Sequence, residues 1–117
     1  MIPADVRAII AAISLAHTTG RNVTGLYDHA AARHLNLTAS ASGTLVNAID
    51  LDRKVKFSGA IPDIFDHGRN NHIHLAGADG EYTGYDHATQ THATIRITDN
   101  VAAVYDHSAA VWTQYTA

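Results

Sequence analysis

An aromatic-Asp-His tripeptide occurs four times in this 117-residue chain, and no other feature constrains the fold as strongly. The last three copies start 20 residues apart, and the first starts 38 residues before them. Five residues after each tripeptide histidine stands another large ring. A fixed period of this length indicates one supersecondary unit that is used repeatedly. The copies start at Tyr27, Phe65, Tyr85 and Tyr105, and their later rings are His34, His72, His92 and Trp112.

Each repeat is predicted to be a β-hairpin with a four-residue loop. The segment Gly68–Asn71 is a poor helix former, so the equivalent loops are placed at 30–33, 68–71, 88–91 and 108–111. An Asp just before such a loop can accept backbone N–H bonds and fix the turn. A fifth, degenerate unit begins at Ile49-Asp50, and its loop, residues 51–53, is expected to be shorter.

The first twenty residues predict a helix. Pro3 suits a first helical turn, Asp5 favours the positive helix end, and Gly20 is a stop signal. Apolar residues at helical spacing make one face, which we expect to cover part of the sheet. They are Val6, Ile9, Ile10 and Ile13.

The predicted fold is mainly β, in a single domain over residues 1–117. An N-terminal helix within 1–20 precedes an antiparallel meander of repeated hairpins over 23–117. About ten short strands rarely stay in a flat sheet, so we expect a barrel-like or two-layer arrangement. The strands are placed at 23–29, 34–38, 44–50, 54–58, 63–67, 72–76, 81–87, 92–98, 101–107 and 111–116.

Alternation along the strands separates two faces, if the third and eighth repeat positions lie opposite each other. One face is aliphatic and is predicted to be the core. It contains Leu26, Leu35, Leu37, Ile64, Ile73, Leu75, Ile95 and Val104. The other face is rich in rings, half-exposed or covered by a second layer or subunit, and it is the expected ligand or partner face. Its aromatic residues are Tyr27, Phe65, Tyr85, Tyr105 and Trp112.

Seven of the nine histidines fall at the third or eighth repeat position, and His-x4-His pairs could ligate a metal. The best candidate trio is His67, His72 and His74, which would take zinc or another divalent transition metal. The stronger alternative is that the pairs are ordinary cross-strand stabilisers. Trp112, which cannot ligate, occupies the eighth position of the last repeat.

Composition limits the function further. A net charge of −3 and a pI near 6.3 argue against nucleic-acid and membrane partners. The absence of cysteine excludes disulfides and thiolate sites, and no apolar run approaches the roughly 18 residues of a membrane span. The N-terminus lacks the pattern of a signal peptide, so a cytoplasmic location is expected.

The serines and glycines show neither a nucleophile elbow nor a phosphate loop, which disfavours an enzyme. The leading interpretation is therefore a non-enzymatic binding or self-assembly module without a cofactor. A homo-oligomer is expected, and a protein or small molecule is the other possible partner. Two alternatives stay open. One is a metal-binding protein, including a metal-dependent enzyme; the other is a binder of carbohydrate or another small ligand through the aromatic face.

Overall fold

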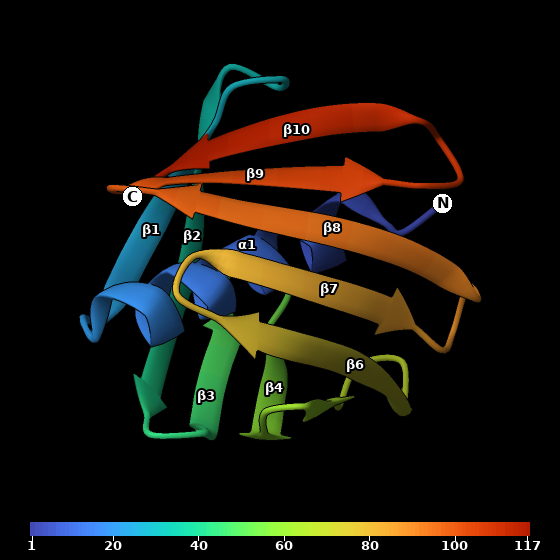
Figure 1. Ribbon diagram of the computed structural model, residues 1–117, viewed down its shortest axis with the longest axis horizontal. Coiled ribbons are helices and arrows are strands. Elements are labelled where there is room, and N and C mark those ends of the chain that lie inside the picture. Colours follow the sequence, from blue (N-terminus) through green and yellow to red (C-terminus); the bar gives the residue numbers. More distant parts are fainter.

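Ten antiparallel strands follow one helix and close into a barrel in the computed structural model, which describes residues 1–117 (Figure 1). Each strand pairs with its neighbours in sequence, and the first strand pairs with the last. The predicted mainly β meander is confirmed, and of the two arrangements left open the barrel forms. The elements are α1 (Ala4–Thr19), β1 (Val23–Asp28), β2 (Arg33–Ser42), β3 (Leu45–Asp50), β4 (Val55–Ala60), β5 (Asp63–Asp66), β6 (Asn71–Ala78), β7 (Glu81–Asp86), β8 (Thr91–Thr98), β9 (Val101–Asp106) and β10 (Val111–Thr116).

Helix α1 lies inside the barrel, between the β1–β4 wall and the β6–β10 wall (Figure 1). Every residue from Val6 to Ala16 is buried, on all sides of the helix. The prediction of a cover with one apolar face was therefore wrong in its placement. The side opposite the predicted stripe is also buried, and it carries Ala8, Ala11 and Leu15. The small alanine side chains allow the strands to approach the helix closely.

A helix in this position fills a volume that side chains alone would leave empty. Eight strands already give a barrel interior that side chains just fill, and ten strands give a wider one. The remaining interior is occupied by aliphatic residues of the strands and by the rings of Phe57, Tyr82 and Tyr115. The predicted aliphatic face is confirmed as the core, with Leu35 only partly buried.

Tyr82 of β7 ties the carboxyl end of α1 to the barrel wall. Its buried hydroxyl shares hydrogen bonds with His17 Nδ1 at 2.6 Å and with Thr18 Oγ1 at 2.9 Å. Burial raises the pKa of this tyrosine, which keeps the hydroxyl protonated. The helix then ends at Gly20, whose left-handed conformation lets its N–H donate to the Ala16 carbonyl.

The two ends of the barrel differ in their connections. One end, the turn end, has two-residue turns such as Asp79-Gly80, where both residues have positive φ as a type I′ turn requires. The other, the loop end, has five four-residue loops, and the last residue of each is left-handed. Those residues are Ala32, Lys54, Asn70, Gln90 and Ala110. The fifth unit thus has the same loop length as the others, and its predicted shorter loop was wrong.

The loops begin one residue earlier than predicted, at the tripeptide histidine. Asp28 pairs with Arg33 and Tyr27 with His34, so the first and eighth repeat positions are cross-strand partners. The expected pairing of the third and eighth positions was wrong. Both alignments leave the same residues on the same face, because they differ by one full pair of residues. The ring-rich face is therefore the outer wall of the barrel.

Because α1 is enclosed, enlarging one of its alanines must destabilise the fold. We expect Ala12→Leu to lower the free energy of unfolding by about 1–3 kcal/mol, because the added atoms overpack a filled interior. Chemical denaturation followed by circular dichroism measures this change. The control Ala88→Leu, at an exposed loop position, should change it by less than about 0.5 kcal/mol. Equal stability of Ala12→Leu and the parent protein would contradict an enclosed helix.

Candidate binding surface

Four clusters of three rings line the outer wall near the loop end. In each cluster the tripeptide aromatic lies between the other two rings, with centroid distances of 4.6–5.0 Å. Such edge and tilted contacts are favourable for aromatic pairs. The four central rings are half-buried, whereas the flanking rings are exposed. The central rings are Tyr27, Phe65, Tyr85 and Tyr105.

The tripeptide histidines also join neighbouring hairpins. The backbone N–H of each donates to a carbonyl on the adjacent strand, as His67 does to Lys56. Three of the four imidazoles share a further bond through Nε2 with a hydroxyl of that strand. The distances are 2.7 Å from His29 to Thr116, 2.9 Å from His67 to Ser58, and 2.8 Å from His107 to Thr94. These contacts favour a structural role for the histidines.

The structure does not bring the predicted metal trio together. Phe65 lies between His67 and His72, with its ring about 5 Å from each. His72 Nδ1 is 3.0 Å from a carboxylate oxygen of Asp63, and His74 is the cross-strand partner of Asp63 and Tyr85. No three His, Asp or Glu side chains of the chain lie in an arrangement that could hold a metal ion.

Trp112, at the eighth position of the last repeat, lies in an open groove on β8–β10. The residue is 45 % exposed. Tyr105 flanks it at a centroid distance of 5.0 Å, and the Arg96 guanidinium lies 5.5 Å from the ring centroid. The groove has a volume of about 480 Å³, and its lining is completed by Thr98, Asp99, Asn100, Val101, Ala103 and Gln114.

Strand register explains how Arg96 reaches Trp112. Arg96 pairs with Glu81 on one side and with Ala103 on the other, and Ala103 pairs in turn with Gln114. The guanidinium makes no ion pair with Glu81 and lies over the indole, which belongs to the strand next but one in the barrel. A cation over an indole face is attracted by the negative face of the ring. The tryptophan is thus held between Tyr105 and Arg96.

Inside the loop end, the tripeptide aspartates point into the barrel, and all four are buried. Each accepts N–H bonds from its own loop, as Asp66 Oδ1 does from Gly68 at 2.8 Å and Arg69 at 3.1 Å. The predicted turn-fixing role of the aspartate is confirmed. Asp50 accepts the same two bonds in the degenerate unit, at 3.2 and 3.3 Å.

Arg69 links the second and third tripeptide units through their aspartates. Its Nε donates to Asp66 Oδ2 at 2.6 Å, and its two terminal nitrogens donate to the two oxygens of Asp86 at 2.8 and 2.7 Å. Burial would raise the pKa of Asp86, but the bonds from Arg69 and Thr89 outweigh it and hold that pKa below its usual range. Burial would lower the pKa of Arg69, and its carboxylate partners raise it instead.

In Asp106 the second carboxylate oxygen is bonded by a backbone N–H rather than by a cation. Its Oδ2 accepts the N–H of Ile2 at 2.8 Å, which fixes the chain just before α1. Burial would raise the pKa of Asp106, but the N–H bonds from Ala109 and Ile2 and the Ser108 hydroxyl lower it overall.

The interior also holds two buried polar atoms without a partner, Arg7 Nε and the Tyr115 hydroxyl. Burial raises the pKa of Tyr115 to about 12.

The sequence indicated Trp112 but not Arg96, Gln114 or Arg69. Arg96 lies 16 residues before Trp112, and only the pairing through Ala103 brings them together. A small residue opposite an arginine on a predicted outer face was the available signal. Arg69 occupies the third loop position, which is Ala31, Thr89 or Ala109 in the other tripeptide units, so the repeat itself gave no indication.

Comparisons of this chain with protein-family models, curated proteins and solved structures find no match. The only helix, α1, is not long and apolar enough to cross a membrane. A function for this surface therefore has to be inferred from its geometry alone.

Removing Arg69 should strongly destabilise the loop end. We expect Arg69→Ala to lower the free energy of unfolding by about 3 kcal/mol, because Asp66 and Asp86 are left buried without their cation. Urea unfolding at neutral pH measures the loss. Arg21→Ala removes an exposed arginine that makes no ion pair, and should cost less than about 0.5 kcal/mol. Similar losses for both variants would contradict this role of Arg69.

Acid should destabilise the loop end of the barrel, because Asp86 and Asp106 become protonated there. The folded pKa values of Asp86 and Asp106 lie below that of an unfolded aspartate, about 3.9, so their contribution is complete above about pH 5 and is lost as the pH falls through the folded values. Thermal midpoints between pH 6 and pH 2 test this. Asp106→Asn should show a shallower decline below pH 4 than the parent protein, and an identical decline would contradict the assignment.

Proposed function

We propose that this protein is a non-enzymatic binding module, and that the groove around Trp112 binds a carbohydrate. The observation that carries this proposal is the half-exposed indole held between Tyr105 and Arg96 in a groove with polar walls. Other small barrels hold ligands in their lumen. Here α1 fills the lumen, which favours the outer wall as the binding surface.

The chemistry of the groove suits a sugar ring. A pyranose has an apolar C–H face, which can stack on an indole, and a rim of hydroxyls. Arg96 offers several N–H donors, Gln114 and Asn100 offer both donors and acceptors, and Asp99 offers acceptors. A mixture of a flat apolar platform and a few convergent polar groups is typical of small-molecule sites.

The fixed position of the indole favours binding further. Ordering a mobile side chain costs roughly 0.5–1.5 kcal/mol on association. Contacts with Tyr105 and Arg96 already restrict Trp112, so part of this cost is met during folding. The ionisable side chains of the groove are Arg96 and Asp99, and neither is coupled to a nucleophile or a second acid, which supports binding rather than catalysis.

The test uses the single tryptophan as its own reporter. Untagged protein is screened on a glycan array, and the strongest neutral oligosaccharide is titrated while Trp112 fluorescence is followed. We expect a saturable fluorescence change in the parent protein. Trp112→His, which restores the residue of the other repeats, lacks the fluorophore, so its affinity and that of the parent protein are compared by calorimetry. We expect the affinity to fall about tenfold or more, or about 1.4 kcal/mol, with the β-sheet signal of the circular dichroism spectrum retained.

His72→Ala is the matched control, because it removes the eighth-position ring of another repeat and should keep the affinity. Equal binding by the parent protein and Trp112→His, or no glycan binding by the parent protein, would contradict the proposal. Light scattering on the same samples tests the expected homo-oligomer. A parent dimer that becomes a monomer in Trp112→His would instead assign this groove to self-association.

A further inference from the structure

A second groove lies directly beside the groove around Trp112 on the outer wall. It has a volume of about 440 Å³ and lies on β6, β7 and β8, and Arg96 lines both grooves. Glu81 and Thr83 are among its exposed lining residues. Together the two grooves cross the strands from β6 to β10, which form one wall of the barrel (Figure 1).

Strand register aligns the outward side chains of this wall in rows that run across the strands. In one row each residue pairs with the next, and its members are Ala76, Thr83, Thr94, Tyr105 and Trp112. The adjacent row, two residues nearer the turn end, contains Glu81, Arg96, Ala103 and Gln114. Because the first three side chains of the first row are small, no bulky residue separates the second groove from the rings of the first.

The length of this surface suits a chain of sugars rather than a single one. Neighbouring strands lie about 4.8 Å apart, which is close to the length of one pyranose residue in an extended chain. The steps from β6 to β10 therefore give room for about four sugar residues. Trp112 provides the stacking platform at one end of this path, and the second groove lies at the other end.

The polar groups of the second groove match sugar hydroxyls. The Arg96 guanidinium lies over the indole rather than against Glu81, so the Glu81 carboxylate is left to accept bonds from a ligand. Thr83 and Thr94 carry hydroxyls, which both donate and accept. The charged side chains of the two grooves are Arg96, Glu81 and Asp99, and one cation with two carboxylates disfavours an anionic chain.

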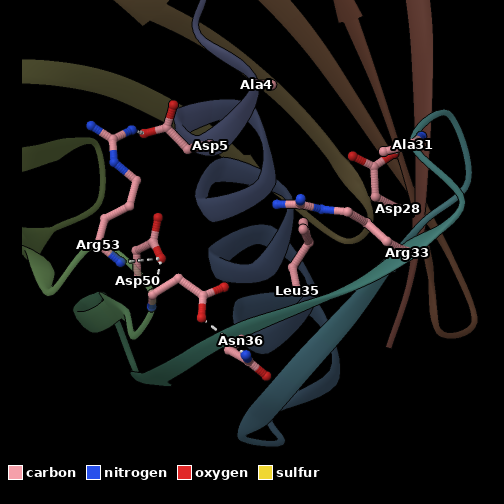
Figure 2. A pocket seen from close by; sticks show the side chains of 10 residues that line it. Ala4, Asp5, Asp28, Ala31, Arg33, Leu35, Asn36, Asp50 and Arg53 are labelled. Atoms are coloured by element: carbon pink, nitrogen blue, oxygen red, sulfur yellow. Dashed lines mark hydrogen bonds and ion pairs between the residues drawn. The ribbon is translucent and has the colours of Figure 1, made fainter.

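The pocket at the loop end, with a volume of about 360 Å³, is less suited to such a ligand (Figure 2). The Arg33 side chain extends toward α1 between Asp28 and Asp50, and Arg53 forms an ion pair with Asp5 (Figure 2). The protein thus places its own cations among these carboxylates. The pocket also has no aromatic side chain on which a sugar ring can stack.

We propose that the two grooves together bind a neutral, linear, β-1,4-linked oligosaccharide that lies across β6–β10. This inference rests on the proposed function and names the class of carbohydrate. Equatorial β-1,4 linkages keep successive pyranose rings in a flat ribbon, which can follow an open wall, whereas an α-1,4-linked chain coils away from it. One sugar stacks on Trp112, and the residues beyond it reach Arg96, Thr83 and Glu81.

The experiment measures how affinity depends on chain length by calorimetry with the whole protein. Cellobiose is compared with cellotetraose, and chitobiose with chitotetraose, because the two series share the β-1,4-linked backbone and differ in the group at C2. We expect at least one tetrasaccharide to bind about tenfold or more tightly than its disaccharide. Maltotetraose, the α-1,4-linked control, should bind more weakly than that tetrasaccharide.

Thr83→Lys tests the second groove separately from the first. The longer side chain should obstruct the second groove, so the tetrasaccharide should lose its advantage while the disaccharide, held at Trp112, keeps its affinity. Thr24→Lys is the matched control, because it makes the same change at an exposed threonine of β1 outside both grooves, and the advantage should persist. Retention of the full advantage by Thr83→Lys would overturn the proposal.

The outcomes separate this inference from the proposed function. A length advantage in one series alone supports the inference and identifies the group preferred at C2, and an advantage in both shows that the backbone is what is recognised. No advantage in either series, or equal binding of maltotetraose, overturns the inference. If a glycan of the array still binds through Trp112 in that case, the proposed function stands; if no glycan binds, both fail.

Discussion

Filling of the barrel by α1 is the constraint on which the rest of the structure depends. Ten strands enclose more space than strand side chains occupy, and a void of that size would cost many dispersion contacts. The helix fills the space with isoleucines on one side and with Ala8, Ala11 and Leu15 on the other. Because the interior is occupied, the ring clusters and the groove around Trp112 lie on the outer wall.

The repeat then distributes two kinds of chemistry. Inward-facing aspartates fix the loops through one carboxylate oxygen. The second oxygen accepts a bond from Arg69 at Asp66 and from the N–H of Ile2 at Asp106, whereas at Asp28 the bonds go to the first oxygen alone. Outward-facing rings join neighbouring hairpins, and only the last repeat replaces the eighth-position histidine by tryptophan. The two departures from the pattern have different consequences: Arg69 joins two units through their aspartates, and Trp112 lines a groove on the outer wall.

Much of the fold could be predicted because the tripeptide recurs at a regular spacing and because side chains alternate between the two faces of each strand. The division into a core face and a ring face was correct even though the loops were placed one residue too late. The true and predicted pairings of Tyr27, His29 and His34 differ by a full residue pair, and side-chain direction has a period of two. Trp112 was identified for the same reason, as an outward ring in the last hairpin.

The enclosed helix and the polar contacts could not be predicted in this way. Ala8, Ala12 and Ala16 are weak evidence for burial in a sequence, and only barrel closure encloses them. Closure pairs β1 with β10, whose residues are more than 80 positions apart, and no local pattern reports it. Arg96 and Arg69 act across strands or across units, so their roles follow from register and from loop geometry that the repeat alone does not specify.

The seam between β1 and β10 has a further consequence for how the barrel opens. It is short, with two residue pairs, Tyr27 with Thr116 and Asp28 with Tyr115, plus the two bonds that His29 makes to β10. Every other strand pair has at least four paired positions. Local opening is therefore cheapest at this junction, and amide protons there should be among the first of the sheet to exchange with solvent. Since β10 must pair with β1 before the barrel can close, a nascent chain leaves the apolar helix α1 uncovered on one side until β10 has been synthesised.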